Sequence, residues 1–337
     1  MLDISFILVS WNVRELLKRA LEAILADAAA ANCVAEIIVV DNASRDGTVE
    51  MLRADFPHVH VIANTENVGF TRGNNQGLTA TASGQYGTNA VSFPSPATAA
   101  ASGRYIFLLN PDTELLPGAL RALLDYMDAP ENARVGIVGP QLVYADGSLQ
   151  SSRRRFPKFS TALFESTKLE QWFPNNSLIT DYRLRPNSVR EMTDDSTTQD
   201  VDWVVGAAMF VRRAVYEQIG GFDERFFMYS EELDWCYRAK QAGWRVVYFP
   251  NARVLHHEGK SSEQVIAQRD IYFHSSKVRY FKKHHGVLQG ELLRWFLLGM
   301  FGFQMLEEAA KYVLGHKREL RAARMKAYRQ VLASGLK

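Results

Sequence analysis

The fold is decided by one stretch, Tyr105-Ile106-Phe107-Leu108-Leu109-Asn110-Pro111-Asp112. Its five consecutive apolar residues predict a strand that is buried on both faces of a sheet. The strand must end at Asn110, because Pro111 cannot donate a ladder hydrogen bond and biases the residue before it towards an extended conformation. Asp112 is therefore predicted at the carboxyl end of a buried strand, where open α/β sheets bind ligands. There it either caps the helix predicted after Pro117 or binds a hard cation that also holds phosphate oxygens.

Upstream of this stretch, three further apolar runs predict strands at residues 4–9, 37–40 and 59–62. Helical segments separate them, and this alternation predicts an α/β fold with a doubly wound, mostly parallel sheet. Polar residues follow the strands, with Ser10-Trp11-Asn12 after the first, Asp41-Asn42 after the second and Asn110-Pro111-Asp112 after the central one. Because the carboxyl ends of parallel strands share one edge, these groups are predicted to line a single nucleotide site.

Residues 67–77 are dense in glycine and amide side chains. This composition favours a loop and helix N-terminus whose backbone approaches a ligand closely, although Asn and Gly also form ordinary turns. Residues 79–103 follow, rich in Ala, Ser, Thr and Gly and without helical or strand periodicity. They are predicted to form a mobile surface insertion.

Acidic residues begin a predicted helix among aromatic side chains in the stretch that contains Glu231, Glu232 and Asp234. The positive helix N-terminus alone would favour these acids. A carboxylate among apolar rings also has a raised pKa and can act as a base, so the same pattern fits proton abstraction. His256 follows a later predicted strand and is either a surface histidine or a ligand.

Charge divides the chain into an acidic body and a basic tail. Residues 277–337 hold 13 Lys and Arg against 4 Asp and Glu, a balance of +9, and since the whole chain carries +2, residues 1–276 carry −7. A basic tail indicates an anionic surface, with membrane lipid ahead of nucleic acid. The two cysteines form no disulfide framework, and the first residues already read as a strand rather than a signal peptide. We therefore expect a cytoplasmic protein.

Taken together, the motifs resemble those of the family 2 glycosyltransferases, in the rhamnosyltransferase-like branch of surface-polysaccharide assembly. They occur in the expected order over residues 4–262: Val9-Ser10-Trp11-Asn12, Val40-Asp41-Asn42-Ala43-Ser44, Asn67-Val68-Gly69-Phe70, Gly73-Asn74-Asn75-Gln76-Gly77, Leu109-Asn110-Pro111-Asp112, Gly206-Ala207, Gly221-Phe222-Asp223-Glu224, Ser230-Glu231-Glu232-Leu233-Asp234-Trp235, and His256 with Gly259 and Ser261. The ordered set carries the resemblance, because each motif alone is modest.

The resemblance implies a GT-A fold over residues 1–265, a nucleotide-sugar donor, a divalent metal (Mg2+ or Mn2+) and inversion at the anomeric carbon. Asp41 would contact the base or ribose, Asp112 and His256 would hold the metal, and Glu232 or its neighbour Glu231 would be the general base. The other donor-binding residues implied are Ser10, Asn12, Asn67, Gly69, Arg72, Asn74 and Asn110. Those implied on the acceptor side are Trp203, Gly206, Asp234 and Trp235.

Two residues depart from the family pattern. The metal motif has a single aspartate, Asp112, and the base position holds glutamate where the wider family often has aspartate. By resemblance, dTDP-rhamnose is the best donor guess, and the acceptor would be a saccharide or lipid-linked saccharide. The main alternative is a non-catalytic sugar-nucleotide-binding relative, which would need no base. A nicotinamide-dependent oxidoreductase is disfavoured, because no glycine follows the first strand.

The C-terminal region, residues 266–337, is predicted to be helical, basic and amphipathic. Its uncharged run over residues 295–306 is too short to span a membrane. We expect it either to lie in the interface at the inner face of the cell membrane or to pack on the core or on a second copy as a homo-oligomer. No nucleic-acid-binding motif is recognised, so nucleic acid is not expected as a partner.

Overall fold

The computed structural model describes residues 2–83, 90–91, 103–167, 169–173, 175–184, 196–257, 266–315 and 317–337. These residues form two compact units. The sheet unit comprises residues 1–156, 188–225 and 232–261, and the helical unit comprises residues 157–187, 226–231 and 262–337. The helical unit therefore includes two segments that the sequence placed in the 1–265 domain. The expected boundary at residue 265 lies outside the described residues.

The strands of the sheet unit are β1 (Ile4–Ser10), β2 (Ala35–Asp41), β3 (His60–Ala63), β4 (Ala90–Val91), β5 (Tyr105–Leu109), β6 (Thr113–Leu115), β7 (Val135–Val143), β8 (Leu149–Gln150), β9 (Arg153–Arg154), β10 (Gln199–Val201), β11 (Trp203–Val204), β12 (Ala208–Arg212) and β13 (Arg245–His256). The described residues form an 11-stranded sheet whose main path runs β10-β13-β7-β12-β5-β1-β2-β3-β4. Strands β5, β1, β2 and β3 are parallel, whereas β12 runs antiparallel to both of its neighbours. The mostly parallel, doubly wound sheet predicted from the sequence is confirmed.

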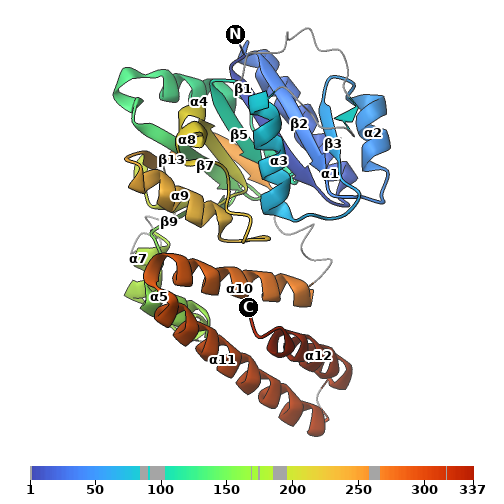
Figure 1. Cartoon of the computed structure of the whole chain (residues 1–337), viewed down its shortest axis with the longest axis vertical. Coiled ribbons are helices and arrows are strands. Elements are labelled where there is room, and N and C mark those ends of the chain that lie inside the picture. Colours follow the sequence, from blue (N-terminus) through green and yellow to red (C-terminus); the bar gives the residue numbers. More distant parts are fainter. Residues whose placement is uncertain are drawn as a thin grey trace. The chain divides into compact units, whose positions relative to one another are not determined.

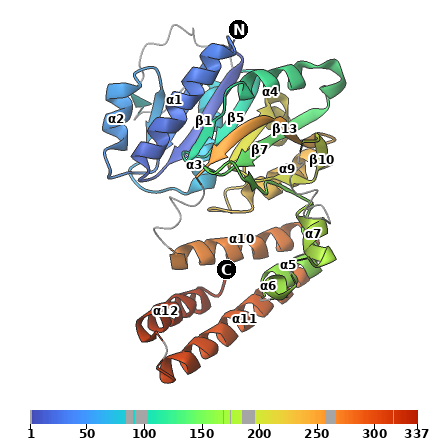
Figure 2. The same cartoon turned by 180° about the vertical axis from the view of Figure 1, so that it is seen from behind.

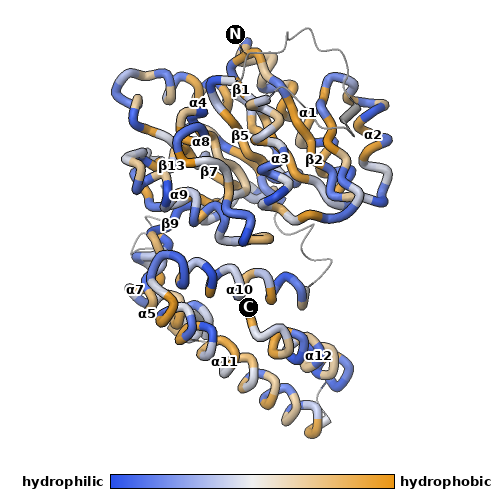
Figure 3. The backbone as a smooth tube through the Cα atoms, viewed as in Figure 1, coloured by the Kyte–Doolittle hydropathy of each residue, from blue (hydrophilic) through white to orange (hydrophobic). Residues whose placement is uncertain are grey.

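Helices cover both faces of this sheet (Figures 1 and 2). They are α1 (Arg14–Ala30), α2 (Thr48–Asp55), α3 (Phe70–Ser83), α4 (Ala119–Asp128), α8 (Arg213–Ile219) and α9 (Glu231–Gln241), with a 3-10 turn at Pro130–Asn132. Alternate residues of β1 serve opposite faces: Phe6 and Leu8 pack in the large core with α1 and α4, whereas Val9 packs towards α3. Figure 3 shows the hydrophobic residues concentrated along these central strands.

Glycines let α3 lie directly on β1. A Cβ at Gly73 would approach Val9 Cγ1 to 2.8 Å, and a Cβ at Gly77 would overlap Ile7 Cγ2. The sequence predicted that glycines in this segment bring backbone close to a ligand. At positions 73 and 77 they instead bring the helix close to a strand, since no larger residue fits between the two elements.

The helical unit contains α5 (Phe159–Glu165), α6 (Leu169–Trp172), α7 (Ser177–Tyr182), α10 (Ile266–His285), α11 (Val287–Val313) and α12 (Arg318–Ser334). Buried Leu293, Leu297 and Phe301 form the inner side of α11. Arg321 of α12 pairs with the buried carboxylate of Glu308 at 2.7 Å. The uncharged run at 295–306 is thus the centre of a much longer helix. Within the described part of the chain, every helix is too short or too polar to cross a bilayer.

Candidate active site

The carboxyl ends of three adjacent strands form the edge of the candidate site. Ser10 at the end of β1 is in register with Asp41 at the end of β2. On the other side of β1, Leu8 is in register with Leu109, so that Asn110 follows the end of β5. The prediction that these polar residues share one edge is therefore confirmed.

Each of these three residues carries a buried polar atom that lacks a hydrogen-bond partner among the described residues: Ser10 Oγ, Asp41 Oδ1 and Asn110 Oδ1. The second oxygen of Asp41 accepts a hydrogen bond from the Ser44 amide at 2.9 Å, so the carboxylate is held with Oδ1 left over. Burial raises the pKa of Asp41 above its ordinary value. Since buried polar atoms are almost always paired, three such atoms on neighbouring strands indicate a ligand site.

A network of amide side chains, which the sequence analysis did not identify, holds the rim of this edge. Asn42 donates from Nδ2 to the Gly69 carbonyl at 3.1 Å and accepts from Asn64 Nδ2 at 3.0 Å. Asn64 and Gln76 exchange two hydrogen bonds, each of 2.9 Å. The loop before α3 is therefore tied to the loop after β2. The sequence signal was the density of glycine and amide side chains at residues 67–77, which includes Gln76 but not Asn64.

Asp112 and His256 lie together at the neighbouring part of the edge. His256 ends β13 opposite Thr113 of β6, so that strand pairing brings it beside the residue before β6. The separation between His256 Nε2 and Asp112 Oδ1 is 3.4 Å, and both side chains are almost fully buried. His256 Nδ1 lies 2.7 Å from Gln150 Oε1. Because that oxygen only accepts, Nδ1 donates the hydrogen bond, and Nε2 is the ring nitrogen that faces Asp112.

This pair fits a divalent cation. A carboxylate oxygen and an imidazole nitrogen converge, and the other imidazole nitrogen is hydrogen-bonded, as in known metal-binding histidines. The described residues contain no group of three or more His, Cys, Asp and Glu that could hold a metal. Two protein ligands leave positions for phosphate oxygens, as is usual where Mg2+ is shared with a nucleotide.

Glu232 lies near the start of α9, half-buried, against Gly206. A Cβ at Gly206 would lie 3.4 Å from Glu232 Cβ and 3.6 Å from its carboxyl carbon. A Cβ at this position would therefore make only ordinary van der Waals contact with Glu232. Glu231, the first residue of α9, is only 3% exposed. Of the two candidate bases, Glu232 is the more accessible.

Three of the residues predicted to contact the acceptor make buried contacts within the protein. Asp234 and Trp235 have no exposed surface, and their polar atoms bond Arg238 and the Gly220 carbonyl. Trp203 is 9% exposed and donates from Nε1 to the Arg155 carbonyl. These three side chains have little or no surface for an acceptor. Gly206 alone among the four lies beside a candidate catalytic group.

Three of the remaining predicted donor residues, Asn12, Asn67 and Asn74, make local hydrogen bonds within the loops and the helix at this edge. Asn12 has a left-handed backbone (φ 53°), donates its amide to Ser44 Oγ and accepts from the Arg45 amide. Asn67 accepts from the Gly69 amide, and buried Asn74 donates to the Phe70 carbonyl within α3. Arg72 is exposed. Gly259 and Ser261 lie outside the described residues, as does most of the expected insertion at 79–103.

Comparison with solved structures supports the fold. The chain aligns over 99% of its length, and over 86% of the other chain, with a mannosyltransferase from Pyrobaculum calidifontis in complex with GDP-Man and Mn2+, at a TM-score of 0.53 and 16% identity. GalNAc-T7 with UDP, GalNAc and Mn2+ gives a TM-score of 0.51 at 16% identity, over 81% of this chain and 47% of that one. The expected GT-A fold is confirmed.

Sequence comparison identifies the family. The family model described as "Glycosyltransferase like family 2" matches residues 3–270. The N-acetylglucosaminyl-diphospho-decaprenol L-rhamnosyltransferase of Mycobacterium tuberculosis is 32% identical over 263 residues, which are 78% of this chain and 80% of that protein. The dTDP-rhamnosyl transferase RfbF of Shigella flexneri is 23% identical over 85% of this chain and 79% of that protein. This chain therefore belongs to glycosyltransferase-like family 2 and is a glycosyltransferase similar to the rhamnosyltransferases.

Proposed function

We propose that this enzyme transfers a sugar, with inversion, from a nucleoside diphosphate donor to a lipid-linked saccharide, and that it requires a divalent metal. One observation carries the proposal: unpaired Ser10, Asp41 and Asn110 atoms converge at the same sheet edge as the Asp112–His256 pair. The first set supplies hydrogen-bonding partners for a nucleoside. The second supplies a cation site for its diphosphate.

The donor lies across the ends of β2, β1 and β5 in this proposal. Asp41 Oδ1 accepts a hydrogen bond from the base or ribose, and Ser10 Oγ and Asn110 Oδ1 pair with the donor's remaining polar groups. A divalent cation held by Asp112 and His256 supplies neutralisation of the charge that develops on the departing diphosphate. Gln150 keeps the imidazole of His256 in the tautomer that binds a cation.

Glu232 is proposed as the general base. Its carboxylate takes the proton from the acceptor hydroxyl, whose oxygen forms the new bond to the anomeric carbon. The bond from that carbon to the diphosphate oxygen breaks, and its electron pair leaves with the nucleotide. Because the acceptor oxygen and the leaving group lie on opposite faces of the sugar, one displacement inverts the configuration. Gly206 lies directly beside this glutamate.

The relatives suggest the substrates. One acts on an N-acetylglucosaminyl-diphospho-decaprenol acceptor, and another is a dTDP-rhamnosyl transferase. We therefore propose dTDP-rhamnose as donor and a polyprenol-linked sugar as acceptor, in cell-surface polysaccharide assembly. The experiment is release of dTDP from dTDP-rhamnose by purified protein with Mn2+ and an N-acetylglucosaminyl-diphospho-prenol.

Glu232→Gln separates catalysis from binding in that assay. The glutamine keeps the shape of the side chain but cannot take a proton, so transfer should fall about 10²–10⁴-fold while dTDP binding is retained. Turnover of the variant at the wild-type rate would remove Glu232 from the mechanism. Donor binding without any transfer by the wild type would favour a non-catalytic sugar-nucleotide-binding protein.

We also propose that α11 contacts the membrane in which such an acceptor resides. One stripe of this helix is exposed along its whole length and carries no charge; its residues recur every three or four positions: Leu288, Leu292, Trp295, Gly299, Phe303, Leu306, Ala310 and Val313. The stripe is about 38 Å long at the α-helical rise. An uncharged face of this kind suits a helix lying in the interface of a bilayer.

Positive charge in the same unit favours an anionic bilayer over a second copy of the chain. Exposed cations follow α11 on the next turn and on α12: Lys317, Arg318, Arg324, Lys326 and Arg329. Such residues attract anionic head groups, each by about 1 kcal/mol close to the surface. In a second copy they would meet the same positive charge.

Vesicle binding tests this part of the proposal. The full chain should sediment with vesicles containing phosphatidylglycerol more than with phosphatidylcholine alone. Trp295→Ser combined with Phe303→Ser should lower the partition coefficient about 10²–10⁴-fold, since each side chain contributes about 1.5–3 kcal/mol when buried. Phe173→Ser removes an equally exposed aromatic residue of the same unit and should bind like the wild type. Dimers that dissociate in the double variant, with unchanged vesicle binding, would assign the stripe to a second copy.

A further inference from the structure

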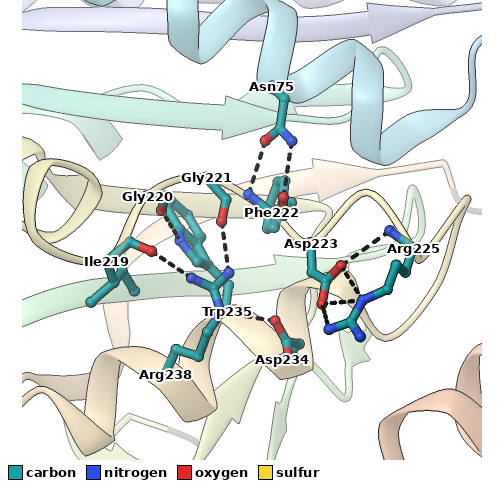
Figure 4. A network of polar contacts seen from close by, with 10 residues as sticks. All are labelled: Asn75, Ile219, Gly220, Gly221, Phe222, Asp223, Arg225, Asp234, Trp235 and Arg238. Atoms are coloured by element: carbon teal, nitrogen blue, oxygen red, sulfur yellow. Dashed lines mark hydrogen bonds and ion pairs between the residues drawn. The ribbon is translucent and has the colours of Figure 1, made fainter. Parts of the chain in front are cut away.

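The loop between α8 and α9 is held on two sides by side chains from helices that are far apart in the sequence (Figure 4). It runs from Gly220 to Arg225 and connects the end of α8 to the segment that leads into α9. One set of contacts comes from α9, the helix that carries Glu232. The other comes from α3, the helix that borders the donor edge.

On the α9 side, three consecutive carbonyl groups accept hydrogen bonds where α8 ends and the loop begins. Arg238 donates from Nη1 to the Ile219 carbonyl and from Nη2 to the Gly221 carbonyl, both at 2.7 Å. Between them, Trp235 Nε1 donates to the Gly220 carbonyl at 2.9 Å. Arg238 thereby also satisfies a terminal carbonyl of α8. The three bonds fix α9 to the loop in one orientation.

Asp234 sets the orientation of Arg238. Its carboxylate is fully buried and accepts a hydrogen bond from Arg238 Nε at 2.9 Å, one helical turn along α9. With Nε engaged, the planar guanidinium can direct its two Nη groups at the two carbonyls. Asp234 therefore acts on the arginine and not on an acceptor.

On the α3 side, Asn75 pairs with both backbone groups of Phe222. Its Nδ2 donates to the Phe222 carbonyl, and its Oδ1 accepts from the Phe222 amide, each at 2.9 Å. Gly221 permits this approach, because a Cβ there would overlap Asn75 Oδ1. The neighbouring residue of α3, Gln76, exchanges hydrogen bonds with Asn64 at the donor rim.

We infer that Asn75, Asp234 and Arg238 are positioning residues that hold the helix of the proposed base, Glu232, in place relative to the donor edge. This inference rests on the proposed function, because the position of α9 matters for catalysis only if Glu232 is the base and the sheet edge binds the donor. The contacts form an unbroken path from Asn42 through Asn64, Gln76 and Asn75 to the loop, and from the loop through Arg238 to α9. Misplacement of a catalytic group by about 1 Å costs on the order of 100-fold in rate.

The first test compares kinetics with nucleotide binding. Arg238→Met and Asn75→Ala should each lower kcat about 10–100-fold, while the KM for dTDP-rhamnose and the Kd for dTDP with Mn2+ stay within about twofold. Arg238→Lys keeps the charge beside Asp234 but cannot reach both carbonyls, so it should fold like the wild type and still lose kcat. Arg225→Met is the control: it removes the ion pair between the exposed Arg225 and Asp223 in the same loop and should keep the wild-type kcat.

The double variant tests whether α3 and α9 act through one path. Asn75→Ala with Arg238→Met should lose no more kcat than the worse single variant, because either change already releases the loop. The inference would be overturned if the kcat losses of the two single variants multiplied in the double variant. It would also be overturned if a variant lost kcat and dTDP affinity equally, or if a folded single variant kept the wild-type kcat.

Hydrogen exchange separates this inference from the proposed function. Asn75→Ala should increase amide exchange in residues 232–238 of α9, although Asn75 lies on another helix. If the wild type transfers no sugar but this exchange rises, the path stands and the proposed function fails. If the wild type is active and exchange in α9 is unchanged, the path is wrong and the function stands.

Discussion

Replacing Gln150 with leucine tests the proposed metal site at a residue that would orient a ligand without binding the metal itself. Gln150 Oε1 accepts a hydrogen bond from His256 Nδ1 at 2.7 Å, and the imidazole is nearly buried. Leucine removes the acceptor at almost the same volume. The imidazole then has no partner there to hold its proton on Nδ1, and Nε2 is no longer fixed as the metal-binding nitrogen.

The size of the effect follows from that single hydrogen bond. A net hydrogen bond is worth about 0.5–1.5 kcal/mol, and a buried donor left without a partner costs about 1–3 kcal/mol. The 10–100-fold loss of metal affinity usual for such outer partners corresponds to about 1.4–2.7 kcal/mol, which lies within the range for the unpaired donor. Gln150→Glu keeps an acceptor oxygen and should bind metal at least as tightly as the wild type.

The assay is electron paramagnetic resonance of free Mn2+ during titration of the protein in the presence of dTDP. The leucine variant should need about 10–100 times more Mn2+ for half-saturation, and its affinity for metal-free dTDP should not change. Wild-type Mn2+ affinity in Gln150→Leu would refute the assignment of His256 as a ligand oriented by Gln150.

Three further outcomes are expected. Asp112→Ala should reduce Mn2+ binding and abolish transfer as EDTA does, and undiminished turnover in chelator would remove the metal from the mechanism. Burial raises the pKa of Asp41 above its ordinary 3.8, so this group stabilises the fold at acid pH and that contribution is lost as pH rises through the folded-state pKa. Asp41→Asn should therefore raise Tm at neutral pH and lose this advantage below about pH 4, and a Tm gain independent of pH would contradict the argument. Gly77→Ala should lower the free energy of unfolding by about 1–3 kcal/mol through overlap with Ile7, whereas Gly299→Ala, in open space on α11, should raise it by up to about 1 kcal/mol; denaturant titration measures both.

The sheet and its functional edge were predictable because they depend on local patterns. Tyr105–Leu109 is a continuous apolar run, and Pro111 ends it without reference to the rest of the chain. Parallel strands then place Ser10 beside Asp41 by register alone. The proximity of Asp112 and His256 came from the resemblance, since no local pattern joins residues separated by most of the fold.

The contacts behind these residues were not predictable in the same way. Gln150 precedes His256 by more than a hundred residues, and only the pairing of β8 with β7 and of β7 with β13 brings it close. Asp234 was expected on the acceptor side. An acidic residue at a helix start can bind a substrate, interact with the positive end of the helix dipole or pair with a neighbouring side chain, and its position alone does not distinguish these roles. Asp234 and Arg238 are one helical turn apart, and this spacing was the available signal that Asp234 pairs with a neighbouring side chain.

The buried polar atoms at the strand ends, which have no partner among the described residues, would make the stability of the protein depend on its proposed nucleotide-sugar substrate. Because Ser10 Oγ, Asp41 Oδ1 and Asn110 Oδ1 have no partner among the described residues, a ligand that bonds to them would stabilise the fold. A nucleotide sugar that supplies those bonds acts as a folding ligand as well as a reactant. In a cell that runs short of the nucleotide sugar, more of this transferase would then be unfolded at any time and open to proteolysis. The abundance of the enzyme would therefore follow the supply of its proposed donor.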